Sequence, residues 1–290
     1  MKFKAFAKRL YPRLVVDIVK LNAQNFDANP PVLVYQMGKV GSTTICRSLR
    51  QANVQHPIYH VHFLSQDGIK SAEAYARSLN NSHVPYHLRF SKALSKKIAQ
   101  AQAQWKIITL VREPIGWEVS NFFQNVARYY PDLIERGQVN QQAALARLTK
   151  TIADYDESSS YVSTWFDREL KVVFGVDVYA HPFDRQRGFS IIREANVSVL
   201  ILRLEDLNHN FSQAVTTFLE LDKPIEMFRS NVAQEKGHAQ ENQFVLENLR
   251  IPEAVCARIY ASRYVRHFYG ADMQAAFTQR WTGIKSYVST

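Results

Sequence analysis

The chain has 290 residues, and 46% of them are hydrophobic, which is enough apolar material for one substantial core. Its 36 Lys and Arg against 26 Asp and Glu give a formal net charge of +10. This balance favours an anionic partner, such as a nucleotide, an acidic glycan, a nucleic acid or an anionic lipid, without choosing among them. The 2 cysteines, Cys46 and Cys256, exclude a disulfide framework and fit a reducing compartment.

Residues 1–29 form a basic, amphipathic segment ahead of a single domain that we expect over residues 30–290. "DANPP" marks the boundary, because residues that precede proline avoid helical angles. Apolar side chains recur at near-helical spacing, at Phe3, Phe6, Leu10, Leu14 and Ile18. We expect this segment either to pack on the domain or, through residues 1–28, to make peripheral contact with an anionic membrane. No apolar run approaches the roughly 18 residues that a span requires, and basic residues interrupt any signal peptide, which predicts a cytoplasmic protein.

From residue 32 onward, short apolar strands alternate with helical patterns. The predicted strands cover residues 32–36, 58–63, 106–111 and 198–204. The predicted helices cover residues 43–53, 91–104, 116–130, 160–174 and 207–221, and the chain is mostly helical from residue 241. Strands that are apolar throughout and separated by helices predict an α/β fold with a central parallel sheet flanked by helices. Ligands of such sheets bind beyond the carboxyl ends of the strands.

The first such position is "QMGKVGSTT", residues 36–44. Its glycines allow unusual backbone angles, and backbone N–H groups at a helix start bind anions. Lys39 precedes Gly41 rather than following it, so the loop differs from the triphosphate loop G-x-x-x-x-G-K-[ST]. No acidic cluster that would bind magnesium is evident. The loop therefore indicates a ligand with a single phosphate and no metal, or an ordinary strand–helix turn.

The third predicted strand ends in "VREPIGWEVS". Arg112 leaves the strand end, Pro114 fixes a turn, and Ser120 follows eight residues after Arg112. Arg offers a planar fork for a phosphate, and Ser offers a hydroxyl. An arginine at this position alone would often be a salt-bridge partner, but the two loops together indicate a site for two anionic groups.

This pair of motifs resembles the two cofactor motifs of the sulfotransferase superfamily, with its P-loop-like fold. "VLILRLEDL" and "EKGH" resemble further segments of that superfamily. The resemblance implies transfer of a sulfuryl group from 3′-phosphoadenosine 5′-phosphosulfate (PAPS) to an acceptor hydroxyl, without a metal, leaving adenosine 3′,5′-bisphosphate. It implies that the cofactor-binding residues are Gly38, Lys39, Val40, Gly41, Ser42, Thr43, Thr44, Arg112, Ser120, Lys236 and Gly237.

The stretches "WFDREL" and "FGVDVYAHPF" are similar to bacterial capsular polysaccharide synthesis proteins. This second resemblance implies a saccharide or glycolipid acceptor and no nucleic-acid partner. Side chains that could read the acceptor are Trp165, Arg168, His181, Arg185 and Arg187, although each alone is more often an exposed charge or a core aromatic.

The second predicted strand carries "IYHVHFLS", in which His60 and His62 point to the same face. The pair resembles histidines of heparan-type sulfotransferases, where one acts as the base. We expect His62 to be the base, His60 to support it and Lys39 to stabilise charge on the sulfonate. A structural or metal-binding role for the pair stays open, and Glu113 or Asp67 would be the next candidate base.

Two other functions remain open from the sequence. A P-loop nucleotide kinase-like enzyme would require magnesium and an acidic ligand. A basic nucleic-acid-binding protein would show binding that depends steeply on salt, without nucleotide turnover.

Overall fold

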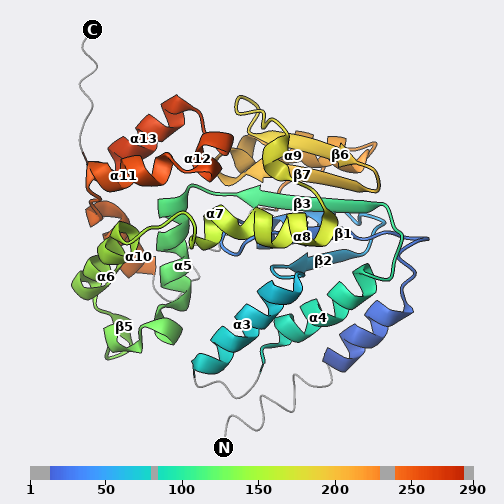
Figure 1. Cartoon of the computed structure of the whole chain (residues 1–290), viewed down its shortest axis with the longest axis horizontal. Coiled ribbons are helices and arrows are strands. Elements are labelled where there is room, and N and C mark those ends of the chain that lie inside the picture. Colours follow the sequence, from blue (N-terminus) through green and yellow to red (C-terminus); the bar gives the residue numbers. More distant parts are fainter. Residues whose placement is uncertain (1–13, 80–83, 229–238, 284–290) are drawn as a thin grey trace, which may run out of the picture.

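The structure, a computed structural model, describes residues 14–79, 84–228 and 239–283. A five-stranded sheet lies at the centre, in the order β2-β1-β3-β7-β6 (Figure 1). The strands are β1 (Val32–Tyr35), β2 (Ile58–Val61), β3 (Trp105–Val111), β6 (Phe189–Glu194) and β7 (Val197–Arg203). Those predicted from apolar runs, β1, β2, β3 and β7, are mutually parallel, and the α/β prediction is confirmed.

The prediction of an entirely parallel sheet was wrong, because β6 pairs antiparallel with β7. β6 and β7 form a hairpin that turns at Ala195 and Asn196, where Ala195 has φ 33°. β6 lies at the edge of the sheet and is only partly buried, so its sequence lacks the continuous apolar run that marks β7.

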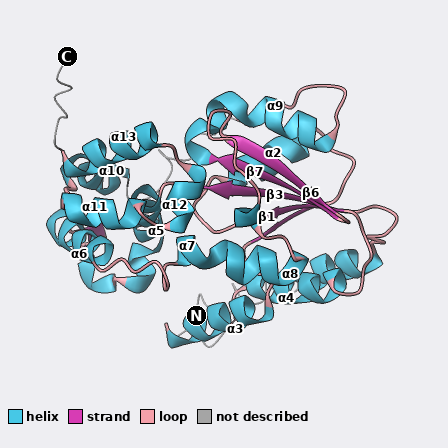
Figure 2. Ribbon diagram, turned by 45° about the horizontal axis from the view of Figure 1, so that its top comes forward, coloured by secondary structure: helices cyan, strands magenta, loops and turns pink. Residues whose placement is uncertain are grey.

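Helices cover both faces of the sheet, as Figure 2 shows. On one face lie α2 (Ser42–Gln51) and α9 (Leu207–Leu219). On the other lie α3 (Gln66–Ser78), α4 (Tyr86–Ile98), α7 (Tyr161–Trp165) and α8 (Lys171–Phe174). A π-helical turn, Phe166–Leu170, joins α7 to α8, so the helix predicted over residues 160–174 is a single helical run. Helix α3 was not predicted, and α4 begins five residues before its predicted start at residue 91.

The remaining elements form a lobe beyond the carboxyl ends of the strands. They are α5 (Pro114–Tyr129), β4 (Ile134–Glu135), β5 (Gln138–Val139), α6 (Gln141–Ala153), α10 (Ala239–Asn248), α11 (Glu253–Tyr260), α12 (Arg263–Phe268) and α13 (Ala271–Thr282). In Figure 1 this lobe stands beside the ends of β3 and β7. It stands beside the carboxyl ends of the strands, where ligands of parallel sheets bind.

The order of the strands places a switch point between β1 and β3. The chain passes from β1 to β2 on one side, whereas from β3 it continues to β7 on the other side. Loops that leave neighbouring strands in opposite directions leave a crevice between them. The loops after β1 and β3 flank this crevice, and they are the loops that carry the predicted anion-binding motifs.

Part of the basic N-terminal segment, residues 1–13, lies outside the described residues. Residues 14–23 form a helix that buries Leu14 and Leu21, while Val15, Val16 and Val19 are exposed. This part of the segment packs on the domain, as one of the two alternatives predicted. None of the helices in the described ranges combines the length and the apolar composition needed to cross a membrane.

Both cysteines are buried free thiols, and burial raises the pKa of each to about 11. Cys46 lies on the inward side of α2, where it packs in the core as predicted. Neither thiol has the low pKa of a reactive cysteine.

Candidate functional site

The loop after β1 combines buried anchors with left-handed backbone. Met37 and Val40 are fully buried, whereas Lys39 has φ 71° and Gly41 has φ 91°. A Cβ atom at Gly41 would also approach Leu204 to 2.9 Å, so glycine is required there. A Cβ atom at Gly38 would meet nothing within 4 Å. The buried side chains of Met37 and Val40 therefore anchor the loop, and the space next to Gly38 is open.

Helix α2 begins at this loop without a side-chain cap and without an acidic residue in its first turn. Helices α3, α5, α6 and α7 are each capped by a side chain, whereas α4, α9, α11 and α13, like α2, are not. Because the first N–H groups of a helix need an acceptor, an uncapped start suits a bound anion. The hydroxyl groups of Thr43, which is exposed, and Thr44, which is half-buried, lie on this first turn.

Side chains from α5 and from the segment that precedes α5 hold the loop after β1 in place. The indole Nε1 of Trp117 donates to the carbonyl of Gly38 at 2.6 Å, and Lys39 Nζ donates to Gln124 Oε1. Arg112 Nη1 donates to the carbonyl of Lys39 at 3.0 Å. The structure therefore brings together the two predicted loops. Trp117 and Gln124 were not predicted, because nothing in the spacing of α5 marks a side chain that contacts a distant loop.

Arg112 is held tightly where β3 ends. Its backbone N–H donates to the hydroxyl of Tyr264 at 3.0 Å, and the same hydroxyl donates to the Arg112 carbonyl at 3.0 Å. Burial lowers the pKa of the Arg112 guanidinium, and the carboxylates of Glu205 and Glu113 act in the opposite direction. The group stays a cation, since arginine does not lose its proton in proteins. Ser120, its predicted partner, lies on the second turn of α5 and is partly buried.

Glu113 is not a suitable base, which corrects the prediction that it could replace His62. It caps α5 by accepting from the N–H groups of Ile115 and Gly116 at 2.8 and 2.6 Å. It also accepts from Tyr260 Oη at 2.9 Å and Trp281 Nε1 at 3.2 Å. A carboxylate that binds four donors inside the protein has no free position for a substrate proton.

Asp67, the other predicted substitute for His62, lies on the surface. Its side chain is 93% exposed in the first turn of α3 and lies 3.8 Å from Lys70. Both carboxylates are therefore excluded as the base, which leaves His60 on β2 and His62 directly after it.

The rings of His60 and His62 lie 4.7 Å apart and almost perpendicular. His62 Nδ1 is 2.9 Å from the carbonyl of Gln36, so Nδ1 carries the hydrogen and Nε2 carries a free lone pair. Burial is the main cause that lowers the pKa of His62. The contact with the Gln36 carbonyl raises this pKa, and the positive charge of Lys39 lowers it. His62 is therefore neutral at pH 7. No group of three or more His, Cys, Asp or Glu residues within the described ranges is arranged to hold a metal ion.

Several polar atoms beside these histidines have no partner among the described residues. They are His60 Nε2 and both amide atoms of Gln36, a residue that is fully buried. Burial, the largest cause, and the neighbouring His62, Arg50 and His87 together lower the pKa of His60 to about 3. Since buried polar groups are nearly always hydrogen-bonded, these atoms mark a place where a ligand or water belongs. His87, on α4, was not predicted because it lies on a different element from the H-x-H pair.

The side chains predicted to read the acceptor do not form one group. Trp165 is a core residue whose Nε1 donates to the carbonyl of His62 at 3.2 Å. Arg168 is exposed on the π-helical turn. His181, Arg185 and Arg187 precede β6, at the far side of the sheet from β2. Lys236 and Gly237 lie outside the described residues.

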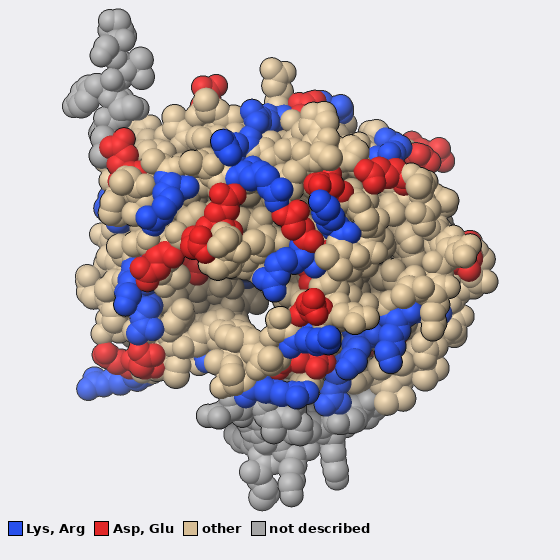
Figure 3. All heavy atoms as spheres, viewed as in Figure 1, with Lys and Arg blue, Asp and Glu red and all other residues tan. Residues whose placement is uncertain are grey.

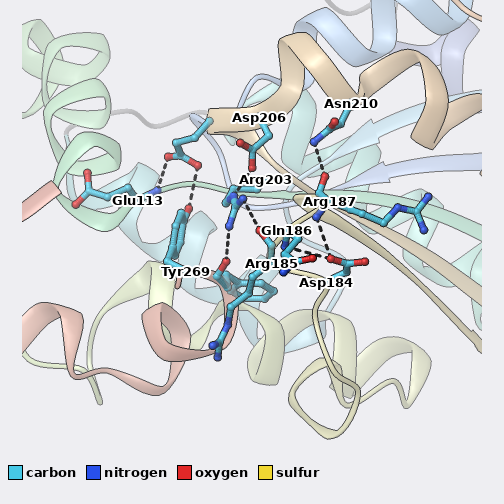
Figure 4. Close-up of polar contacts among 11 residues, drawn as sticks. Glu113, Asp184, Arg185, Gln186, Arg187, Arg203, Asp206, Asn210 and Tyr269 are labelled. Atoms are coloured by element: carbon cyan, nitrogen blue, oxygen red, sulfur yellow. Dashed lines mark hydrogen bonds and ion pairs between the residues drawn. The ribbon is translucent and has the colours of Figure 1, made fainter. Parts of the chain in front are cut away.

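Arg185 and Arg187 belong instead to a network around the end of β7 (Figure 4). The buried Arg203 guanidinium donates to the carbonyls of Phe268 and Arg185, each at 2.9 Å, and pairs with Asp206. Nearby, Glu205 accepts from the N–H of Glu113 at 2.8 Å and from Tyr269 Oη at 3.1 Å. This network joins β7, the turn before β6 and the C-terminal helices, and its role is structural.

One family model matches the chain, over residues 146–270, and it is described as "Putative capsular polysaccharide synthesis protein" (NKWYS). The match runs from α6 to the residues between α12 and α13, which is less than half of the 290 residues. It bears out the similarity to capsular polysaccharide synthesis proteins for this region and does not include the loops after β1 and β3. No curated protein matches the chain.

Proposed function

We propose that the protein is a sulfotransferase that moves a sulfuryl group from PAPS to a hydroxyl of a saccharide or glycolipid. The observation that carries this proposal is the contact from Arg112 to the Lys39 carbonyl, which joins the two loops that we propose as anion sites at the switch point of the sheet. PAPS carries its phosphosulfate and its 3′-phosphate on opposite sides of one ribose. Two adjoining anion sites suit a ligand of that shape.

The residues of the loops fit this cofactor. The open space at Gly38 and the uncapped start of α2 would receive the 5′-phosphosulfate. Arg112 uses one of its five N–H donors on Lys39, which leaves others for the 3′-phosphate. Ser120, Lys236 and Gly237 complete the cofactor site that we propose by resemblance.

His62 is the base in this proposal. Its Nδ1 contact with Gln36 leaves Nε2 as the proton acceptor, and its lowered pKa keeps it unprotonated at neutral pH. The acceptor oxygen bonds to sulfur and gives its proton to Nε2, while the bond from sulfur to the phosphate oxygen breaks. The Lys39 ammonium stabilises the negative charge that collects on the departing phosphate.

The saccharide acceptor is supported by the family match over residues 146–270. Enzymes that build capsules act on sugar hydroxyls, and a sugar hydroxyl needs a base to become a nucleophile. This support is separate from that of the two loops, because the matched residues contain neither loop.

The test is the thermal unfolding of the purified protein with adenosine 3′,5′-bisphosphate in the presence of EDTA. At about 100 times its dissociation constant, a bound nucleotide should add roughly 2.7 kcal/mol to the free energy of unfolding. Stabilisation by ATP with magnesium alone would instead indicate a kinase-like enzyme. Stabilisation by a polynucleotide alone, lost steeply with salt, would indicate a nucleic-acid-binding protein.

A further inference from the structure

Two cavities lie on either side of one tyrosine beside the candidate site. The first, which we name the α5–α6 pocket, has a volume of about 320 Å³ and lies between α5, the end of α6 and the start of α7. The second, the α3–α7 pocket, has a volume of about 200 Å³ and lies between α3 and α7. Tyr161 lines both pockets.

Each pocket adjoins a loop of the candidate site. Trp117 lines the α5–α6 pocket and donates to the carbonyl of Gly38. Phe63 and Trp165 line the α3–α7 pocket; Phe63 follows His62 in the chain, and Trp165 donates to the His62 carbonyl. Tyr161 contacts Trp117 at 5.6 Å and Phe63 at 6.1 Å between ring centroids. A ligand crossing Tyr161 would therefore pass along the edge that carries Lys39 and His62.

The surface is hollowed between two of the helices that line these pockets. Figure 3 shows an opening between α3 and α5, in the orientation of Figure 1. It lies beyond the carboxyl ends of β1 and β2, where an acceptor must enter to meet a group bound at the loop after β1.

The chemistry of the larger pocket suits sugar hydroxyls. Its described lining includes aromatic rings together with carboxylate, amide and hydroxyl groups and contains no Lys or Arg; its polar members include Glu118, Asn121, Asp154, Tyr155 and Ser159. Burial raises the pKa of Glu118 to about 7, so its carboxyl group both donates and accepts hydrogen bonds near neutral pH. The α3–α7 pocket differs, because the exposed Arg168 is among its lining residues.

The sizes of the pockets indicate an elongated ligand. Pockets for compact, drug-sized ligands usually measure about 300–1,000 Å³, and the α3–α7 pocket alone is smaller than this. A chain of sugar rings can place one ring in each pocket and another over Tyr161 between them, whereas a single ring can fill only one pocket.

We infer that the two pockets are neighbouring subsites for an oligosaccharide chain that crosses Tyr161, with a sugar that carries no negative charge in the α5–α6 pocket. The inference rests on the proposed function for the identity of the acceptor. The ring that lies over Tyr161 presents its hydroxyl to Lys39 and His62, so the enzyme modifies a chain rather than a free monosaccharide.

The test uses an array of bacterial capsular oligosaccharides graded from one to eight sugar units, probed with the full-length protein. Retention should rise at least about tenfold between one and four units, because longer chains fill both subsites. Asn121→Trp fills the α5–α6 pocket and Ser71→Trp fills the α3–α7 pocket, and each should lower retention at least about tenfold. Thr217→Trp, in a third cavity beside β6, is the matched control and should bind as the wild type does.

Retention that is independent of chain length, equal retention by the filled variants, or no retained fragment at all would overturn the inference. If Asn121→Trp or Ser71→Trp does not unfold cooperatively, Ser159→Trp and Ala72→Trp are used in place of this first pair. Stabilisation by adenosine 3′,5′-bisphosphate, measured on the same wild-type preparation, separates this inference from the proposed function. Nucleotide binding without glycan retention contradicts the subsites alone, whereas chain-length-dependent retention without nucleotide binding supports the subsites and contradicts the cofactor assignment.

Discussion

Two regions at the same edge of the sheet differ in how their polar groups are satisfied. Around Arg203, at the end of β7, the guanidinium, the Asp206 carboxylate and the carbonyls of two distant segments all pair with one another (Figure 4). Around the loop after β1, the start of α2 has no side-chain cap, and His60 Nε2 and the Gln36 amide have no partner among the described residues.

The difference separates a structural role from a functional one. Both regions are rich in cations, so charge alone does not distinguish them. A network whose donors and acceptors are matched within the protein contributes to stability and has little to offer a ligand. Buried polar atoms that remain unmatched reduce stability, and a ligand that pairs with them removes that cost.

Replacing His62 by Ala should lower the turnover of sulfuryl transfer by about 10²–10⁴-fold, the usual contribution of a general base. The affinity for adenosine 3′,5′-bisphosphate should change little, because the proposed contact of His62 is with the acceptor. Turnover with labelled PAPS and calorimetry with the nucleotide measure the two quantities. His181→Ala, a histidine paired with Glu194 at the far side of the sheet, is the control. Turnover within a few-fold of the wild type in His62→Ala would remove His62 from the mechanism.

Replacing Arg203 by Ala should lower the free energy of unfolding by about 3–5 kcal/mol, because it leaves the Asp206 carboxylate and two carbonyls without their donor. Denaturant unfolding measures this change. Arg187→Ala is the control, since Arg187 is exposed and lies over the Phe189 ring at 4.4 Å, a contact worth about 0.5–1 kcal/mol. Equal losses in the two variants would contradict the structural role of the network.

Replacing Arg112 by Ala should weaken the binding of adenosine 3′,5′-bisphosphate by about 1.5–3 kcal/mol, which is a loss of at least about tenfold in affinity. Calorimetry without metal measures it. Arg185→Ala is the matched control, because Arg185 lies at the same edge and donates to the carbonyls of Arg266 and His267. Should both variants bind as the wild type does, Arg112 is not part of a nucleotide site.

Acidification should destabilise the protein partly through His60. Its pKa in the folded state, about 3, lies below the ordinary value of 6.5, so the folded state resists protonation. Stability from this residue is complete above pH 6.5 and is lost as the pH falls toward 3. Between about pH 6.5 and 5 the wild type should lose about 1–2 kcal/mol more than His60→Gln. Denaturant unfolding at the two pH values measures the difference. His209→Gln, on the surface of α9, is the control. Identical losses of stability in the wild type and His60→Gln would show that His60 is accessible to protons.

The parts of the fold that follow from local pattern could be predicted from the sequence. The runs that became β1, β3 and β7 are mostly apolar because both faces of these strands are buried. β6 was missed because it is an edge strand with partly exposed positions, and α3 was missed because it buries few side chains.

The same reasoning separates the predicted and unpredicted residues of the candidate site. Lys39, Arg112 and His62 lie in the segments that follow β1, β3 and β2, so their position at the carboxyl ends of the strands follows from the parallel order. Gln36 and His87 become noticeable only when the three-dimensional surroundings show an unmatched amide or a neighbouring histidine. The prediction that Trp165 contacts the acceptor was wrong, because an aromatic residue that packs in the core cannot be told from the sequence from one that stacks on a sugar.

Hydrogen–deuterium exchange with and without adenosine 3′,5′-bisphosphate tests the central claim most directly, because it reports on both regions in one experiment. The account predicts slower exchange for residues 36–44 and 112–121 when the nucleotide is bound. It predicts no change for residues 184–188 and 203–210, which include the paired side chains of Arg203 and Asp206 and the paired carbonyl of Arg185. Protection confined to the Arg203 network, or no protection at the loop after β1 at a saturating nucleotide concentration, would contradict the account.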